Sequence, residues 1–133
     1  MRCWKHWPRP EHRRRTPVRP TRYPMRMSVL ICLTTCPDLD AAHRIAAALV
    51  DERLAACVNI VPGIHSTYRW QGEVVGEEEV LLILKTTPDR MEALRTRLPA
   101  LHPYELPELL AVESANGLGA YLDWVRAETR PAP

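Results

Sequence analysis

A short segment bounded by prolines carries side chains that suit ligand recognition. In LHPYELPE, Pro103 and Pro107 fix their own backbone angles and restrict the residue before each of them. The stiff segment displays an imidazole, a phenol and two carboxylates, from His102, Tyr104, Glu105 and Glu108. Two interpretations are equally open: the segment recognises a ligand, or its prolines only end a helix and guide the chain into a strand.

Two charged features of the predicted strands are further candidates. Lys85 follows an apolar run, where a lone ammonium needs an anion. That anion is either a ligand's carboxylate or phosphate or, as we favour, a structural glutamate such as Glu108 or Glu113. The run 77–79 is three glutamates, which cannot all face one ion because successive strand residues point to opposite faces. We expect it to be a solvated edge that discourages aggregation.

The cysteines and the motif content argue against enzymatic and zinc-type chemistry. The chain contains no CxxC pair, Gly-rich phosphate loop, GxSxG or HExxH motif. Cys32 and Cys36 would lie about 13 Å apart in one strand, too far for a disulfide. Cys57 lies in an apolar strand and should be inert. We therefore predict that the protein is not an enzyme.

Charge divides the chain into two parts. Residues 1–26 hold nine Lys/Arg and one acid, whereas the rest holds nine Lys/Arg and fifteen Asp/Glu. The acidic part is a poor nucleic-acid surface, since phosphate contacts need clustered basic residues. The proline-rich basic segment is predicted to be disordered. We favour the interpretation that it is upstream sequence read from an early start; the alternatives are a transit peptide and a nucleic-acid-binding tail. With no apolar run near 18 residues, we expect no membrane span and a cytoplasmic location.

The acidic part, residues 27–129, reads as one α+β domain followed by a tail at 130–133. Hydrophobic periodicity predicts strands at 28–35, 57–61, 64–70, 73–86 and 108–113. Helices are predicted from 39 to about 54 with Asp38 as the cap, from 88 to about 98 with Pro99 ending it, and at 120–128. Pro62–Gly63 predicts a bulge, and Gln71–Gly72 predicts a tight hairpin turn. The order is the ferredoxin-like β-α-β-β-α-β with a C-terminal helix.

The predicted hairpin is too long for a single compact chain. Strands of about 14 residues extend about 45 Å, whereas a domain of this size has a radius of gyration near 13 Å. A projecting, partly apolar ribbon with free edges would aggregate unless other chains cover it. The sequence therefore predicts a closed oligomer.

Six phrases in order along the body resemble the CutA divalent-cation tolerance family. They are TTCPD at 34–38, ERLAACVNIVPG at 52–63, STYRWQGEV at 66–74, ILKTT at 83–87, LHPYELPE at 101–108 and YLDW at 121–124. The resemblance implies a ferredoxin-like subunit, similar to PII-type signal proteins, that forms a homotrimer through its long hairpins. It also implies a role in divalent-cation tolerance, with copper binding in some members.

The copper-binding pattern that the resemblance implies is incomplete in this chain. It requires a cysteine late in the first strand and two adjacent histidines before Pro-Tyr, where this chain has Thr34 and Leu101-His102. Cys36 lies two residues after Thr34, on the same strand face, and is the substitute ligand that we consider beside His102. The alternative is that Cys36 is a small buried residue and His102 a hydrogen-bonding loop residue.

The aromatic residues and the overall function complete the predictions. Trp70 and four other aromatics either form a pocket between subunits or, as we favour, pack in the trimer core: Tyr68, Tyr104, Tyr121 and Trp124. We predict a trimeric regulator that binds a metal or small ligand through the 102–108 loop, Lys85 and Cys36. The alternatives are an assembly module that anchors other proteins, and nucleic-acid binding through the basic tail.

Overall fold

The computed structural model describes residues 28–132, so the basic segment 1–26 lies outside the described residues. The elements are β1 (Leu30–Cys36), α1 (Leu39–Asp51), β2 (Cys57–Trp70), β3 (Glu73–Thr86), a 3-10 turn η3 (Pro88–Arg90), α2 (Met91–Leu101), β4 (Leu110–Glu113) and α3 (Gly119–Glu128). None of the helices in this part of the chain is long and apolar enough to cross a membrane.

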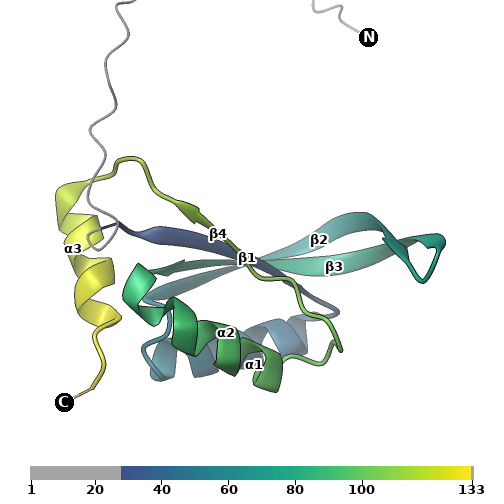
Figure 1. Cartoon of the computed structure of the whole chain (residues 1–133), viewed down its shortest axis with the longest axis horizontal. Helices are drawn as coiled ribbons and strands as arrows, with labels where there is room; N and C mark the ends of the chain where they lie inside the picture. The colour runs from purple at the N-terminus through teal and green to yellow at the C-terminus, as the bar shows by residue number, and fades with distance from the viewer. Residues whose placement is uncertain (1–27, 133) are drawn as a thin grey trace, which may run out of the picture.

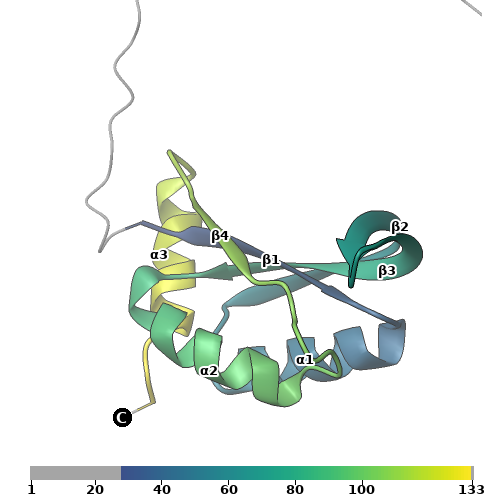
Figure 2. The ribbon, with the colours of Figure 1, turned by 45° about the vertical axis from the view of Figure 1, so that its right-hand side comes forward.

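The four strands form one antiparallel sheet in the order β2-β3-β1-β4. With α1 and α2 crossing the same face, this is the predicted ferredoxin-like arrangement (Figure 1). Figure 2 shows both helices beneath the sheet and α3 standing across its end. Within residues 28–132, no helix covers the opposite face of the sheet.

Strand alternation separates a buried sheet face from an open one. Residues of β1 alternate between buried and half-buried, and the buried set packs with Leu82 and Leu84 against the helices through Ile45, Leu49, Leu94 and Leu98. α3 closes a second cluster in which Leu122 and Val125 meet Val29 and Ala56. The strand register defines the open face: Ile31 pairs with Lys85 on one side and Val112 on the other, and Leu33 pairs with Ile83 and Leu110. The apolar residues of this face are Ile31, Leu33, Leu81, Ile83, Leu110 and Val112.

The hairpin of β2 and β3 extends well beyond the rest of the sheet (Figure 1). β1 pairs only with residues 80–86 of β3, so the stretch 73–79 has β2 as its one strand neighbour among the described residues. The predicted bulge is confirmed by a register shift between Val61 and Ile64, where Gly63 has φ 79°. The turn is confirmed at Gln71 and Gly72, whose φ values of 49° and 80° suit a two-residue hairpin.

Several predicted boundaries were wrong by a few residues. β1 begins at Leu30, α1 ends at Asp51, β4 begins at Leu110 and α3 begins at Gly119. The cap was predicted correctly, since Asp38 Oδ1 accepts from the Ala41 N–H at 2.8 Å. The largest error is Pro99, which does not end α2: the helix runs to Leu101, and the His102 N–H donates to the Leu98 carbonyl at 3.0 Å. A proline in the last turn leaves only one hydrogen bond unmade, so packing of Leu98 can carry the helix past it.

Replacing Pro99 by alanine should therefore stabilise the protein. The substitution restores an N–H donor toward the Arg95 carbonyl and removes the ring clash, and the greater freedom of the unfolded chain offsets part of the gain. We expect an increase of about 1–2 kcal/mol in the free energy of unfolding, measured by denaturant titration at fixed protein concentration. Lower stability in Pro99→Ala would show that the proline supports the helix end.

Candidate functional site

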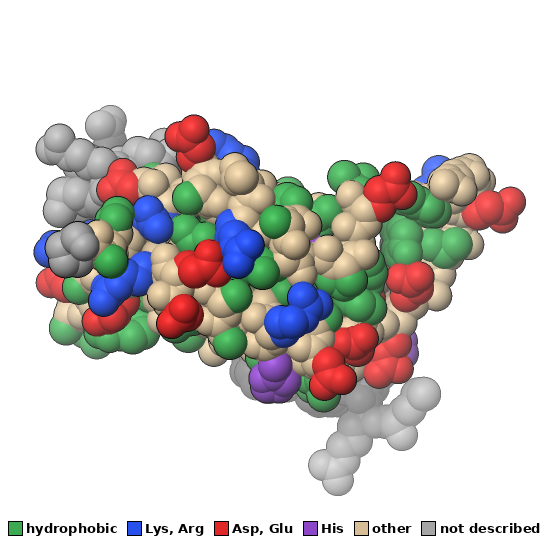
Figure 3. All heavy atoms as spheres, turned by 90° about the horizontal axis from the view of Figure 1, so that it is seen from below, with side chains coloured by type: hydrophobic (Ala, Val, Ile, Leu, Met, Phe, Trp, Pro, Cys, Tyr) green, Lys and Arg blue, Asp and Glu red, His purple; other side chains and the backbone are tan. Residues whose placement is uncertain are grey.

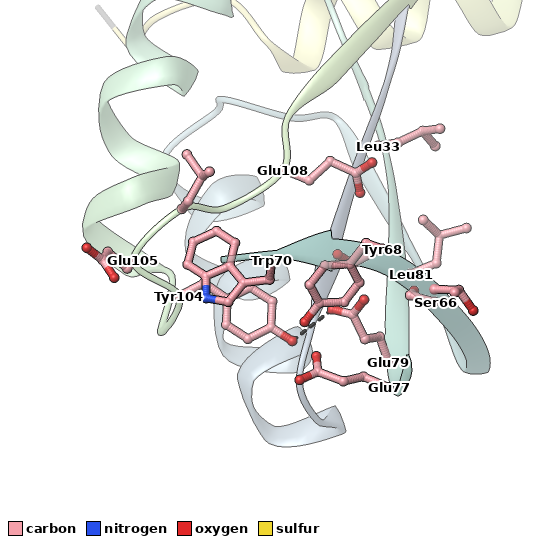
Figure 4. Close-up of a pocket in the computed structure, with 13 residues that line it drawn as sticks. Leu33, Ser66, Tyr68, Trp70, Glu77, Glu79, Leu81, Tyr104, Glu105 and Glu108 are labelled. Carbon is pink, nitrogen blue, oxygen red and sulfur yellow. Dashed lines mark hydrogen bonds between the residues drawn. The ribbon is translucent and has the colours of Figure 1, made fainter. Parts of the chain in front are cut away.

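A cleft of about 720 Å³ lies on the open sheet face, between the base of the hairpin and the loop after α2. Figure 4 shows Tyr68, Trp70 and Tyr104 gathered at one side of this cleft, with the glutamates around them. The lining residues come from β1, β2, β3 and the loop: Leu33, Thr35, Ser66, Thr67, Tyr68, Trp70, Glu77, Glu79, Leu81, Tyr104, Glu105, Leu106 and Glu108. The proline-bounded loop and Trp70, two predicted candidates, thus share one site.

One wall of the cleft is formed by the hairpin overhang, the part of β2 and β3 that extends beyond the end of β1. Ser66, Tyr68 and Trp70 alternate along β2, so all three point to one face of the ribbon. Opposite them on β3, Tyr68 pairs with Val75 and Ser66 pairs with Glu77. Tyr68 and Trp70 remain 37% and 41% exposed, which leaves their rings available for contact. The other predicted aromatics, Tyr121 and Trp124, stack on α3 with ring centroids 5.8 Å apart and do not line the cleft.

The cleft is acidic. Its described lining includes four glutamates and no lysine or arginine. In Figure 3 the hairpin end carries mostly hydrophobic and acidic side chains, while the basic side chains of that view lie mainly over the body. Carboxylates beside aromatic faces attract cations, through charge and through the ring quadrupole.

One buried hydrogen bond joins the loop to the hairpin. The Tyr104 hydroxyl donates to Glu79 Oε2 at 2.8 Å, and Glu79 is only 5% exposed. Burial, followed by this bond, raises the pKa of the Tyr104 phenol well above its ordinary value. Glu77 acts likewise on Tyr68, whose pKa is raised chiefly by a hydrogen bond to that carboxylate. Both phenols therefore remain protonated donors, and the carboxylates remain acceptors.

The prediction of a solvated acidic edge was wrong for Glu79. The other two glutamates of the run are exposed, but Glu79 is buried beneath Tyr104. One usable signal was present in the sequence, because Glu79 immediately precedes the buried Val80 where β3 enters the core. Its partner, 25 residues away, had no local signature.

His102 faces inward and holds the loop in place. Its Nε2 lies 2.7 Å from the Thr35 carbonyl, and its Nδ1 accepts from the Tyr104 N–H at 3.0 Å. A carbonyl only accepts, so Nε2 carries the proton and the ring is the neutral tautomer. The ring also packs on Tyr104, with centroids 4.8 Å apart. His102 is 7% exposed and positions Tyr104 from behind the cleft.

Cys36 lies in the core, on the same strand face as Thr34 as predicted. It is fully buried, and burial raises the pKa of its thiol to about 11. Thr34, at the position where the resemblance implies a copper-ligating cysteine, has a buried hydroxyl that makes no hydrogen bond within the described residues. Across residues 28–132, no three His, Cys, Asp or Glu side chains lie together in a way that would hold a metal ion. Metal binding by Cys36 and His102 stays a prediction that needs ligands beyond these.

The structure does not bring Lys85 to the cleft. It shares the open face with Leu81 but lies four residues further along β3, about 13 Å away. The prediction of a glutamate partner was also wrong: Lys85 Nζ donates to Asn59 Oδ1 and lies 4.0 Å from Cys57 Sγ. Glu108 lines the cleft, and Glu113 accepts from the Ser28 hydroxyl at 2.5 Å.

The fold and the site together define a ferredoxin-like protein with an acidic, aromatic cleft beside a projecting hairpin. The model of the CutA1 divalent ion tolerance protein family matches residues 30–128, and the chain belongs to this family. The divalent-cation tolerance protein CutA of Thermus thermophilus is 54% identical over 99 residues, which are 74% of this chain and 96% of that protein.

Solved structures agree with this assignment. The divalent cation tolerance protein Cut A1 of Thermus thermophilus superposes with a TM-score of 0.75 at 53% identity, over 77% of this chain and 99% of that one. CutA of Xylella fastidiosa gives a TM-score of 0.74 at 49% identity, over 77% and 98%. The ferredoxin-like prediction and the family resemblance are confirmed.

The bond between Tyr104 and Glu79 should contribute measurably to stability. In Tyr104→Phe the buried carboxylate loses its donor, so we expect unfolding to become easier by about 1–3 kcal/mol. In a Glu79→Leu background, which has no acceptor at this position, the same change should cost less, and the difference is the coupling energy of the pair. Denaturant titrations at one protein concentration provide the measurement.

Tyr121→Phe is the matched control. This tyrosine is 40% exposed on α3, so loss of its hydroxyl should change stability by no more than about 0.5 kcal/mol. An equal effect of the two tyrosine substitutions, or additive effects at 104 and 79, would contradict the assigned bond.

Proposed function

We propose that the protein acts in the response to divalent cations, as a non-enzymatic homotrimer that binds a metal ion or small cationic ligand in the cleft. The observation that carries the proposal is the lining of the cleft, in which four glutamates and three aromatics meet no lysine or arginine among the described residues. Carboxylate oxygens are ligands for divalent cations, including Zn(II). Because no three of the described side chains lie together in a way that would hold a metal ion, the remaining ligands would come from a neighbouring copy. The names of the family and of its Thermus thermophilus relative refer to tolerance of such ions.

The open sheet face supports assembly. Val112 and Leu110 are 56% and 59% exposed there, beside the half-buried Ile31, Leu33, Leu81 and Ile83. A contiguous apolar patch next to an overhanging hairpin is typical of a surface that other chains cover. The number three follows from the family resemblance, and a closed ring of copies would leave no ribbon edge unpaired. A neighbouring copy seated on this face would also complete the cleft.

Val112→Glu should disrupt the assembly. A carboxylate on the covered face would be buried in an apolar interface, so we expect sedimentation equilibrium to shift from about three chain masses toward the 15.2 kDa of one chain. Val50→Glu is the matched control, because Val50 is 42% exposed on α1, away from the open face. A monomeric wild-type protein, or equal effects of the two variants, would rule out assembly through this face.

A metal titration tests the cleft. Calorimetry with Zn(II) and Cu(II) should find a saturable site in the full chain that Glu77→Gln with Glu108→Gln weakens by about tenfold or more. Glu92→Gln, an exposed carboxylate on α2 outside the cleft, should leave it unchanged. The basic segment contains Cys3, His6 and His12, so each variant is also made with these three replaced by alanine. Absence of saturable binding by both metals would overturn the proposal of a divalent-metal site in the cleft.

A more specific version of the proposal is that the protein binds copper through Cys36 and His102. Such a site requires the buried Cys36 thiol to lose its proton and His102 to release one of its two hydrogen bonds. In the same titration, Cys36→Ala and His102→Ala should each lose Cu(II) binding, whereas Cys32→Ala, the buried control, should retain it. That result would indicate that Cu(II) binds at Cys36 and His102. Retained binding in those variants, with loss in the glutamate variant, would place it in the cleft.

A further inference from the structure

A second pocket, remote from the acidic cleft, concentrates positive charge. It has a volume of about 250 Å³ and lies where η3 meets the C-terminal end of α3. Its lining is Thr87, Asp89, Arg90, Arg126, Thr129, Arg130 and Pro131. Three arginines from two separate segments therefore face one small space, with a single carboxylate.

The pocket is basic, whereas the body of the chain as a whole is acidic. From residue 27 onward the chain has nine basic and fifteen acidic residues, yet a third of the basic ones line this pocket. Three guanidinium groups placed together repel one another, and each is always charged at neutral pH. An arrangement of this kind is stabilised when an anion is bound between them.

Fixed contacts hold two of the three arginines in position. Arg90 Nε donates to the Arg53 carbonyl at 3.2 Å, which leaves its Nη groups without a hydrogen-bond partner in the described chain. Arg126 Nη2 donates to Asp123 at 2.7 Å, and its side chain is 23% exposed. The two segments that line the pocket are also joined to each other, because the buried Thr87 and Thr129 hydroxyls lie 3.4 Å apart and link η3 to the end of α3. The guanidinium groups are thus presented on an ordered scaffold.

The size and donors of the pocket specify a ligand class. A cavity of 250 Å³ is below the roughly 300–1,000 Å³ that encloses whole organic ligands, so it suits a small anion or the anionic end of a larger molecule. Guanidinium forks match the paired oxygens of phosphate in a bidentate geometry. We propose that Arg90, Arg126 and Arg130 form a binding site for phosphate, either as the free ion or as the terminal group of a small phosphomonoester.

Phosphate titration of the full chain tests this site. Followed by calorimetry and by the ³¹P NMR signal, inorganic phosphate should bind saturably, and Arg90→Gln and Arg126→Gln should each weaken binding by about tenfold or more. Glycerol 3-phosphate in a parallel titration separates the two sources: binding as tight as that of phosphate indicates a phosphomonoester, and weaker binding indicates the free ion. Asp89→Asn removes the one carboxylate that lines the pocket and should tighten binding.

Arg95→Gln is the matched control. Arg95 is exposed on α2 outside the pocket and its substitution changes the net charge by the same amount. The nine basic residues of segment 1–26 are present in every variant, so any weak binding by that segment cancels in the comparison. No saturable phosphate binding, or equal weakening by Arg95→Gln and the pocket variants, would overturn the proposal. So would variants that lower only thermal stability, because Arg126 and Arg130 would then serve the helix end alone.

Discussion

The difference in length between β1 and β3 is the constraint on which the architecture depends. β1 offers seven residues of pairing, and β3 has fourteen, so half of β3 runs past the body of the sheet with β2 beside it. The overhang forms one wall of the cleft, and the same strands expose an apolar face that a single chain leaves open. The cleft and the exposed apolar face are therefore two consequences of one register, and a shift of that register would remove both.

The cleft depends on how the loop after α2 is anchored. Residues 103–107 contain two prolines, which limit the shapes of the loop, but the anchoring bonds come from His102 and Tyr104. His102 ties the loop to the β1 backbone, and Tyr104 ties it to Glu79 on β3. The loop thereby bridges two strands that the sheet already holds, and Glu105 and Glu108 are displayed at the cleft by a segment fixed at one end.

The sequence predicted most of the fold because the relevant signals are local. Gln71–Gly72, Pro62–Gly63 and Asp38 each act on their immediate neighbours, and each was interpreted correctly. Pro99 was misinterpreted because the tertiary packing of Leu98 outweighs one missing hydrogen bond. The site was predicted less well. Trp70 and the loop line one cleft, whereas packing in a trimer core was the favoured prediction for Trp70. The positions of Lys85 and Glu79 depend on cross-strand register and on partners distant in sequence. The pocket of Arg90, Arg126 and Arg130 brings together residues about 40 apart and had no local motif.

Burial and hydrogen bonds fix the donor and acceptor roles of several potentially reactive groups. Both nitrogens of His102 are engaged in hydrogen bonds, and Glu79 accepts from Tyr104. A thiol nucleophile needs a low pKa, whereas burial raises the pKa of Cys32 and of Cys36 to about 11. The phenol of Tyr104 is likewise held in its protonated form. Each of these environments suppresses proton transfer and keeps donors and acceptors in fixed roles, as the proposed ion-binding role requires.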